Sequence, residues 1–439
     1  MIKSALKTFN RSLRSFILAQ VKLVDPAGKI KMALKQFDCI VLGGGLIGLT
    51  AALALAKLNL NIAVVERSSL KLLKTSTGDQ RTSAISASSK VMLDTLGIWD
   101  LLKGDAEPIL DIRVSEKNTR GFVHYSHADA DNQPMGYIIE NEIIKTTLID
   151  AIETSSNVHL LFDHPISSFS DSQTLIRLEL SDGRSLGGRL LVAADGANSH
   201  IRTLSGMKTT RLDYEQISIV FTVNHTIPHH GIAHERFLPG GPIAFLPMTN
   251  QRSSVVWTEK SAIANDLVNL TTEDFLRGAS LRIDNCLGKL SLIGSRAMYP
   301  LSLIYSGNLI KNRLVLVGDA AHRIHPIAGQ GLNLGLRDIA HLIDKLAHAQ
   351  YAGMDIGDHE VLRRFQSSRL VDNMSLIAAT DGLNRLFSNS SFSIKALRGF
   401  GLSAVNRAGP LKRIFMREAM GQSGKIPSLL EGTLPNYGD

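Results

Sequence analysis

A short glycine-rich segment, Gly43-Gly44-Gly45-Leu46-Ile47-Gly48, limits the folds open to this chain more than any other feature of the sequence. It follows an apolar stretch that predicts a strand, Phe37–Leu42, and it opens an alanine-rich stretch that predicts a buried helix, Leu46–Leu58. A second apolar stretch, Asn61–Val65, predicts another strand and ends in Glu66. This order predicts a strand–turn–helix–strand unit with two parallel strands.

The spacing of the glycines in this turn is typical of dinucleotide-binding sites. Gly43 would allow the tight turn, Gly45 would let a pyrophosphate approach the backbone, and Gly48 would let the helix pack closely on the strand. The helix N-terminus offers free N–H groups and a positive dipole end to phosphates. Glu66, 18 residues after Gly48, is placed to accept hydrogen bonds from ribose hydroxyls. The alternative is a glycine-rich turn of any α/β protein.

Length and composition narrow the class of protein further. The chain has 439 residues, of which 44% are hydrophobic, so it can bury a large core and is neither a disordered protein nor a disulfide mini-protein. Its two cysteines, Cys39 and Cys286, cannot build a disulfide framework or a metal cluster. The 18 residues from Cys39 to Ala56 carry no charge and approach the length of a spanning helix, but the glycine triplet disfavours a transmembrane segment.

Positive charge is concentrated at the N-terminus. The formal net charge is +8, and residues 1–35 hold eight basic side chains against Asp25 alone, so the rest of the chain is nearly neutral. A neutral body gives no charge support for nucleic-acid binding. The arm 1–31 is basic and has apolar residues at helical spacing. Three interpretations are open: a transit-peptide-like segment, a membrane-surface helix, or translated sequence upstream of a start at Met32.

Two later turns carry acidic residues at the ends of predicted strands. The apolar stretch Leu190–Ala194 ends in Asp195-Gly196, which alone is an ordinary strand end. The stretch Arg313–Val317 runs into Gly318-Asp319, where Gly318 allows a sharp turn. Asp319 is therefore a candidate for binding the hydroxyls of a sugar-like chain.

A third candidate segment follows the second of these turns. Beyond Pro326, the segment Gly329–Asn333 opens a predicted helix whose N–H groups could face an anionic ring or a phosphate. His322 and His325 lie just before it, but no carboxylate/histidine cluster at ligand spacing accompanies them. A metal site is therefore disfavoured.

The three turns, in this order, resemble those of the flavin-dependent aromatic hydroxylases, the single-component FAD monooxygenases. The run from His325 to Asp338 is more specific and is similar to the signature of the ubiquinone-biosynthesis branch of that family. Four shorter segments are also similar to that branch: Arg81–Ser86, Leu96–Trp99, Tyr214–Gln216 and Ala419–Gly421. The resemblance covers residues 36–432.

The resemblance implies roles for individual residues. The residues of the glycine unit would hold the ADP half of FAD: Gly43, Gly45, Gly48 and Glu66. Arg81 would lie near the flavin or its phosphates, Asp195 and Gly196 would help to bind both FAD and NAD(P)H, and Asp319 would bind the ribityl chain. The residues of the third segment would approach the isoalloxazine ring: Pro326, Gly329, Gly331, Leu332 and Asn333. No side chain is expected to act as a catalytic group, since the flavin carries the chemistry.

The implied activity is hydroxylation of a polyprenylated phenol on the route to ubiquinone. FAD would accept a hydride, with NAD(P)H as the expected reductant, and the reduced flavin would react with O2 to give a hydroperoxide that passes one oxygen to the ring. The protein would position the ring and exclude water. Two alternatives remain: a hydroxylase of small soluble aromatic acids, and a flavin reductase or redox-sensing module that hydroxylates nothing.

A polyprenylated substrate partitions into lipid, so the resemblance implies peripheral contact with a membrane or with a ubiquinone-biosynthesis protein complex. Two surfaces are candidates: the basic arm, and the C-terminal helical region with Phe387, Phe392, Phe400 and Phe415. The expected location is the cytoplasm, at the inner membrane, or the mitochondrial matrix if the arm is a transit peptide.

The order of predicted elements indicates an α/β fold: a Rossmann-like FAD-binding domain interleaved with an antiparallel-sheet substrate domain, followed by a helical C-terminal region. The FAD-binding domain would comprise residues 36–110, 141–212 and 300–350, and the substrate domain residues 111–140 and 213–299. Residues 351–439 would form the helical region, and residues 1–35 the basic arm. Two helices are predicted within this plan, one over Ile85–Leu96 and one capped by Asn141.

Overall fold

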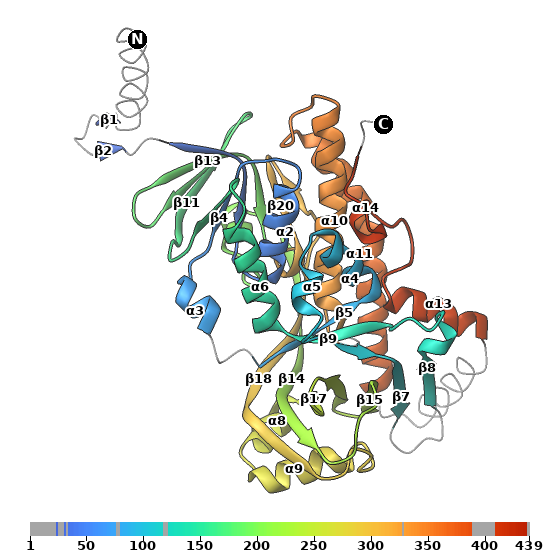
Figure 1. Ribbon diagram of the computed structural model, residues 1–439. Helices are drawn as coiled ribbons and strands as arrows, with labels where there is room; N and C mark the ends of the chain where they lie inside the picture. Colours follow the sequence, from blue (N-terminus) through green and yellow to red (C-terminus); the bar gives the residue numbers. More distant parts are fainter. Residues whose placement is uncertain are drawn as a thin grey trace, which may run out of the picture.

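The computed structural model describes residues 23–24, 30–31, 34–75, 80–116, 122–326, 329–388 and 409–436. Two large sheets lie one above the other, with helices around the upper sheet and two short helices beneath the lower one (Figure 1). Of the basic arm, only two short paired strands are described, β1 (Leu23–Val24) and β2 (Ile30–Lys31). The predictions for the rest of residues 1–31 lie outside the described residues.

The upper sheet has eight strands and contains the glycine unit. Its central strands run parallel: β10 (Val158–Leu161), β4 (Ile62–Val65), β3 (Lys35–Leu42), β13 (Ser185–Ala193) and β20 (Leu314–Leu316). Three strands extend it in antiparallel fashion: β11 (Ile166–Asp171), β12 (Ile176–Leu180) and β19 (Ile310–Lys311). Because the carboxyl ends of parallel strands share one edge, β3, β13 and β20 bring all three sequence motifs to the same edge of this sheet.

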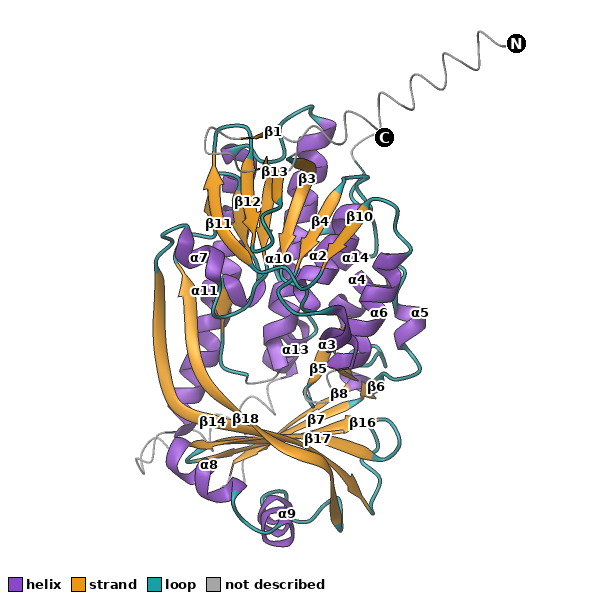
Figure 2. Cartoon of the chain, turned by 90° about the vertical axis from the view of Figure 1, so that its left-hand side faces the viewer, coloured by secondary structure: helices purple, strands orange, loops and turns teal. Residues whose placement is uncertain are grey.

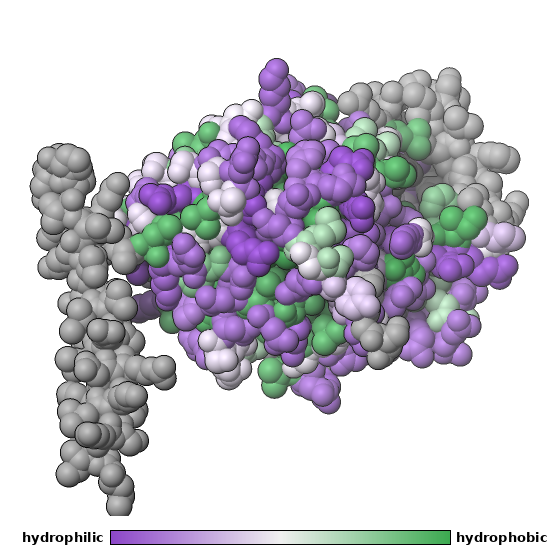
Figure 3. Space-filling model, turned by 90° about the horizontal axis from the view of Figure 1, so that it is seen from above, coloured by the Kyte–Doolittle hydropathy of each residue, from purple (hydrophilic) through white to green (hydrophobic). Residues whose placement is uncertain are grey.

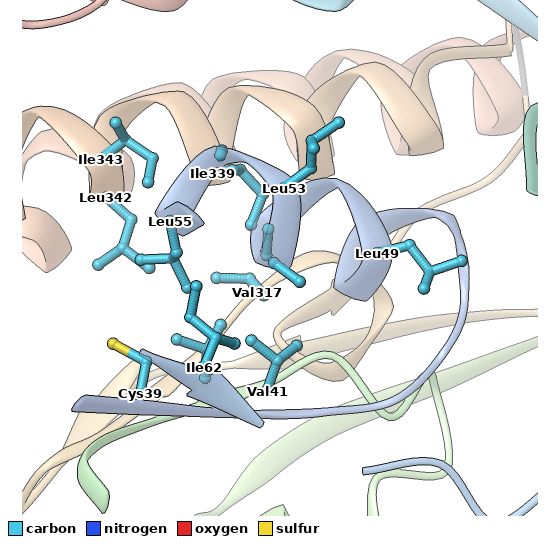
Figure 4. Close-up of a cluster of buried hydrophobic side chains, with 14 of the residues drawn as sticks. Cys39, Val41, Leu49, Leu53, Leu55, Ile62, Val317, Ile339, Leu342 and Ile343 are labelled. Atoms are coloured by element: carbon cyan, nitrogen blue, oxygen red, sulfur yellow. The ribbon is translucent and has the colours of Figure 1, made fainter. Parts of the chain in front are cut away.

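Helix α2 (Leu46–Ala56) packs on this sheet and is buried from Gly48 to Leu55. Figure 4 shows Leu53 and Leu55 of α2 between strand residues such as Val41 and Ile62 and the residues Ile339, Leu342 and Ile343 of helix α10 (Gln330–Tyr351). Alanine-rich sequence suits such a helix, since small side chains let it approach the sheet on one side and α10 on the other. The core therefore fixes the N-terminus of α2 at the edge where the motifs meet.

The lower sheet also has eight strands, in the order β21-β18-β14-β17-β16-β15-β7-β8. Its two longest strands, β14 (Thr209–His225) and β18 (Leu290–Ser306), curve up toward the upper sheet (Figure 2). The other strands are β7 (Asp111–Glu116), β8 (Phe122–Ser126), β15 (Ile232–Leu238), β16 (Gly241–Met248), β17 (Arg252–Lys260) and β21 (His322–Arg323). Helices α8 (Ser261–Val268) and α9 (Thr272–Leu281) cover its far face, with Phe275 packed against Phe221 and Trp257.

A small antiparallel sheet lies between the two large ones and consists of β5 (Thr82–Ser86), β9 (Gly136–Glu140) and β6 (Glu107–Ile109). The remaining helices are α3 (Leu70–Thr75), α4 (Ala87–Thr95), α5 (Trp99–Leu102), α6 (Asn141–Glu153), α7 (His200–Leu204), α11 (His359–Ser388), α13 (Gly409–Ala419) and α14 (Ser428–Glu431). Two 3₁₀ turns are His127–Asp129 and Gly318–Ala320.

The structure confirms the predicted fold class, including the helical C-terminal region, while the exact domain boundaries stay a prediction. Two local predictions were wrong. Residues 85 and 86 belong to β5, because the Ser86 side chain accepts a hydrogen bond from Ser89 N and so caps a helix that begins only at Ala87. Glu140, not Asn141, precedes α6, and the Asn141 amide oxygen instead accepts a hydrogen bond from Ser83 Oγ (2.6 Å).

The outer surface over the upper sheet is mostly hydrophilic, with scattered hydrophobic residues (Figure 3). The uncharged stretch from Cys39 to Ala56 divides into the end of β3, the glycine turn and α2. Among the described residues, no helix combines the length and the apolar character needed to cross a membrane.

Candidate functional site

A cavity of about 660 Å³ lies between the upper sheet's motif edge and the lower sheet. It is lined by ten of the residues predicted to bind the cofactor or to lie near it: Gly45, Glu66, Arg81, Gly196, Asp319, Pro326, Gly329, Gly331, Leu332 and Asn333. The other three, Gly43, Gly48 and Asp195, are not lining residues, but each is next in sequence to one that is. The structure therefore gathers motifs from distant parts of the sequence around one space.

The glycine turn has no room for side chains at two of its positions. Gly43 has φ +113°, and a Cβ there would lie 2.4 Å from the carbonyl oxygen of Ala194. A Cβ on Gly48 would lie 1.9 Å from the carbonyl oxygen of Gly43, so α2 packs against its own entry turn. At Gly45, by contrast, a Cβ would meet nothing within 4 Å. Gly43 and Gly48 are thus required by the fold itself, whereas Gly45 leaves the backbone open toward the cavity.

Glu66 lies at the end of β4, across from the turn. Its Oε2 accepts a hydrogen bond from Gly44 N (2.6 Å) and its Oε1 accepts one from Ser68 N (2.8 Å). These two bonds hold the carboxylate at the cavity wall. A carboxylate oxygen can accept more than one hydrogen bond, so this geometry leaves acceptor capacity for ribose hydroxyls.

Asp195 and Gly196 form the turn after β13. Asp195 Oδ2 accepts hydrogen bonds from His200 N (2.8 Å) and Ile201 N (3.3 Å) at the start of α7. Asp195 Oδ1 is buried and has no hydrogen-bond partner among the described residues. Because a buried acceptor without a donor is costly, this atom is a place where a ligand donor or an ordered water would fit.

Arg202, which follows this turn in sequence, connects it to the Gly318-Asp319 turn. Its guanidinium group donates to the carbonyl oxygens of Ala320 (2.7 Å) and Ala197 (2.9 Å). Burial lowers the pKa of Arg202, while the charge of Asp195 opposes that shift. The sequence pattern assigned Arg202 no role, and the structure shows that it holds the two acidic turns together.

Asp319 presents its carboxylate to the cavity. The side chain is exposed, but the exposed surface faces the cavity and is surrounded by protein. This enclosure raises the pKa of the Asp319 carboxyl, opposed by the positive charges of His322, Arg323 and Arg81. Removal from bulk water strengthens any hydrogen bond that Asp319 makes to a ligand hydroxyl.

The N-terminus of α10 forms the next part of the wall. Gly329 precedes it in the left-handed conformation (φ +63°). Asn333 in its first turn accepts a hydrogen bond from Ser86 N (2.9 Å) and donates one to Ala84 O (2.8 Å). Its side-chain amide therefore joins α10 to β5 and fixes the helix end at the cavity. On the same side, the guanidinium of Arg81 lies 5.2 Å from the centre of the Tyr299 ring.

The opposite wall of the cavity is the inner face of the lower sheet, which the sequence analysis did not identify. It presents mostly small and apolar side chains: Val220, Ala233, Pro242, Ala244, Leu246 and Val256. Two hydroxyl groups interrupt it, Ser218 Oγ and Thr258 Oγ1, which lie 2.8 Å apart in a hydrogen bond. Strand β15 adds His234 and Glu235 to the lining, and Arg323 of β21 is the basic residue that the lower sheet contributes to it among the described residues. The sequence alone did not identify these lining residues, because the inner face is marked only by side chains that point alternately to the two faces of β14 and its neighbouring strands.

His325 also lines the cavity, and its Nε2 lies 3.3 Å from Gln216 Oε1. Burial lowers the pKa of His325 to about 4, with the charge of Asp381 opposing the shift. The ring is therefore neutral near pH 7. His322 lies apart from the cavity wall, fully buried and 2.6 Å from Asp338 Oδ2.

Comparison with known proteins places this architecture among the flavoproteins. The family model described as "FAD binding domain" matches residues 36–371. The ubiquinone hydroxylase UbiL of Rhodospirillum rubrum is 41% identical over 88% of this chain and 90% of its own length. The mitochondrial ubiquinone biosynthesis monooxygenase of Rattus norvegicus is 31% identical over 87% of this chain and 90% of its own length. The crystal structure of p-nitrophenol 4-monooxygenase from Pseudomonas putida superposes with a TM-score of 0.74 at 18% identity, over 90% of this chain and 100% of that one, and so shares the fold.

Proposed function

Because the chain belongs to the FAD-binding-domain family, we propose that it is an FAD-dependent monooxygenase that hydroxylates the aromatic ring of a polyprenylated phenol in ubiquinone biosynthesis. One observation carries the proposal: a single cavity has a dinucleotide-type turn at one end and an apolar sheet face at the other. A cofactor and an aromatic substrate can then meet in a space that excludes water.

The turn end of the cavity fits FAD in three respects. The backbone at Gly45 is open, the Glu66 carboxylate is held at the cavity wall by Gly44 N and Ser68 N, and Asp319 faces the cavity. We therefore assign Gly43, Gly45, Gly48 and Glu66 to the ADP half, Arg81 to the flavin or its phosphates, and Asp319 to the ribityl chain. Asp195 and Gly196 would contact both FAD and NAD(P)H. The remaining residues would lie at the isoalloxazine ring: Pro326, Gly329, Gly331, Leu332 and Asn333.

When bound, FAD supplies hydride acceptance from NAD(P)H and the activation of O2. The chain contributes position and environment. The α10 N-terminus directs N–H groups and a positive dipole end toward the flavin site, which favours negative charge there. The apolar strands of the lower sheet keep water from the reacting ring, and the Ser218–Thr258 pair offers hydroxyls that can orient a phenol.

Among the described residues, strands β7, β14, β15, β16 and β17 place no lysine or arginine on the cavity, and β15 places Glu235 there, which favours a phenol over a small aromatic acid. The arginine that the lower sheet does contribute, Arg323 of β21, donates to Pro300 O (3.0 Å). A benzoate-type substrate would bring a carboxylate, which needs a cation or several donors when it leaves water. The polar groups that the lower sheet contributes to the cavity lining are the hydroxyls of Ser218, Thr258 and Tyr299, the imidazole of His234, the carboxylate of Glu235 and the guanidinium of Arg323. Burial lowers the pKa of His234 to about 4, so its ring is neutral near pH 7. A phenol with an apolar substituent matches these groups better.

Quinone profiling of a deletion strain tests the proposed activity. We expect the strain to lose ubiquinone and to accumulate a polyprenylated precursor that lacks one ring hydroxyl, which would also identify the ring carbon. Reintroducing the gene should restore the quinone. An unchanged quinone profile would contradict the proposal, and NAD(P)H consumption coupled to hydroxylation of simple benzoates would favour the small-acid alternative.

A lipid-partitioning substrate also leads us to propose peripheral membrane contact through α13. This helix exposes Ile414 (61%) and Phe415 (46%) beside the exposed Arg413 and Arg417, while Met416 and Ala419 face inward, the latter lining the cavity. Basic residues near an anionic bilayer contribute about 1 kcal/mol each. The side chains of Phe387, Phe392 and Phe400, the other phenylalanines considered for this role, lie outside what the structure describes.

Sedimentation with vesicles that contain an anionic phospholipid tests this contact. The double variant Ile414→Ser/Phe415→Ser should lose sedimentation but keep FAD, whereas Leu101→Ser, which removes an equally exposed apolar side chain (63%) from α5, should not. A protein that starts at Met32 should still bind FAD, sediment in part and restore quinone synthesis. Loss of quinone synthesis with FAD retained would instead make the arm a targeting or docking element, for example for a mitochondrial or complex-bound location.

A further inference from the structure

The turn that carries Asp319 is held from behind by a buried carboxylate. Gly318 has φ +57°, and its N–H donates to Asp338 Oδ2 in α10 (3.0 Å). The same oxygen lies 2.6 Å from His322 Nε2, at the far end of the turn. One carboxylate oxygen thus contacts both ends of the five-residue segment 318–322, and Asp319 lies within that segment.

The other oxygen of this carboxylate is held in turn by Arg369 of α11. Arg369 Nε donates to Asp338 Oδ1 (2.8 Å), and both residues are 0% exposed. The remaining guanidinium nitrogens donate to Asp372 Oδ2 (2.6 Å) and Asn373 Oδ1 (2.9 Å). Burying two opposite charges is costly unless each is paired and hydrogen-bonded, and here every contact of the pair has good geometry.

These partners also decide the ionisation of Asp338. Burial acts to raise its pKa, but the charges and hydrogen bonds of His322 and Arg369 prevail and lower it to about 2. The carboxylate is therefore charged at any working pH, and it acts as an acceptor for the Gly318 N–H and the His322 ring.

The network continues to the C-terminal segment. Arg337, next to Asp338 in α10, pairs with Asp372 (3.0 Å) and donates to the carbonyl oxygens of Gly421 (3.1 Å) and Ser423 (2.6 Å). Side chains from α10 and α11 and the backbone after α13 therefore support the turn from the side away from the cavity. None of these groups lines the cavity, so contact with cofactor or substrate is not their role.

We propose that Asp338 is a positioning residue for the cofactor: together with Arg369 it holds the Gly318-Asp319 turn in the conformation that presents Asp319 to FAD. The inference rests on the FAD site of the proposed function and is independent of the substrate. Asp338 acts through the turn, so its loss should weaken FAD binding and leave the substrate wall intact.

FAD dissociation constants, measured by flavin fluorescence, test the proposal. Asp338→Asn should raise the dissociation constant at least tenfold. Asp344→Asn is the control in the same helix: it removes a carboxylate of α10 that is only half-buried and whose Oδ2 accepts from Ser428 N (3.4 Å), and it should change the constant less than twofold. An equal dissociation constant for parent and Asp338→Asn would overturn the proposal. An unmutated protein that binds no FAD would instead overturn the proposed function.

Two further variants separate positioning from stability. Asp338→Leu/Arg369→Met replaces both charges by apolar groups of similar size, which often restores stability lost on removing one partner. We expect its apoprotein to melt near the parent temperature while FAD binding stays weak; recovery of both would overturn the proposal. Arg369→Lys keeps a cation and should fold even where the others do not, with a severalfold loss in FAD affinity; an unchanged affinity counts against the proposal.

A double-mutant cycle checks whether Asp338 acts through Asp319. If it does, Asp319→Ala should weaken FAD binding strongly in the parent and much less in the Asp338→Asn background, because the carboxylate is already displaced. Strictly additive losses would show that the two residues act independently and would overturn the proposed mechanism of positioning.

Discussion

The two ends of the cavity are built by different means. At the turn end, backbone geometry sets the shape. A Cβ added to Gly43 or Gly48 would lie within 3 Å of neighbouring backbone atoms, and a buried ionic network holds the Gly318-Asp319 turn. At the sheet end, side chains that strands present to the cavity, such as Val220 and Ala244, set the shape.

This difference determines what a substitution can change. A site whose shape is set by closely packed backbone tolerates few substitutions, because a side chain added where two backbone segments touch must displace the main chain. Side chains on a regular strand can be exchanged without moving the strand. Substitutions at the turn end should therefore affect FAD, whereas those at the sheet end should affect the substrate alone.

The largest expected effect comes from Gly45→Val. A Cβ there has no protein atom within 4 Å, so we expect the apoprotein to be about as stable as the parent, while the branched side chain would occupy the space assigned to the pyrophosphate. We expect the protein to purify largely without yellow colour, with FAD affinity reduced more than about a hundredfold, which corresponds to roughly 3 kcal/mol. Gly104→Val, at another open glycine, is the control. Full flavin occupancy in Gly45→Val would contradict the assignment of Gly45 to the pyrophosphate of FAD.

Asp319→Ala should have the next largest effect. A hydrogen bond to a charged group contributes roughly 1.5–3 kcal/mol, so FAD affinity should fall by about tenfold to a hundredfold. Hydroxylation should fall with it, because the flavin is held less well. An unchanged FAD dissociation constant would show that Asp319 is only a turn residue at the end of a strand and does not bind FAD.

Ala244→Leu tests the sheet end of the cavity separately from the turn end. Three extra carbon atoms on the cavity face should raise KM for a polyprenylated phenol by about tenfold, the scale of an apolar size mismatch, with FAD affinity unchanged. Ala262→Leu, in the exposed part of α8, makes the same change outside this cavity. A parallel loss of FAD in Ala244→Leu would show that the two ends are not independent.

The smallest effect concerns acid stability. His325 titrates at 6.5 when unperturbed but at about 4 when buried in the fold, so between these pH values the unfolded chain binds more protons and stability falls as pH drops. His325→Gln should flatten this dependence, reducing the loss of melting temperature between pH 6.5 and 4 by roughly 3 °C. Identical pH profiles for parent and variant would show that the His325 ring is already charged or solvated.

More of the residues at the turn end of the cavity than at the sheet end could be predicted from the sequence. The glycine turn, Glu66 and Asp319 could be predicted because a tight turn and a strand-end acid leave fixed residue types at fixed spacing. Strands such as β15 and β18 could not, since their inward residues are small, varied and identified only by pairing with distant strands. Asp338 lay within the His325–Asp338 signature, yet its role depends on Arg369, 31 positions away and brought close only by the packing of α10 on α11.

The source of the new oxygen atom in the product tests whether this protein is an FAD-dependent ring hydroxylase. The purified FAD-loaded protein would be supplied with NAD(P)H, a polyprenylated phenol and dioxygen made of a heavy isotope, and the product would be analysed by mass spectrometry. We predict one new ring hydroxyl that carries a single heavy oxygen atom from dioxygen. NAD(P)H oxidation that yields only hydrogen peroxide, or a hydroxyl whose oxygen comes from water, would contradict it.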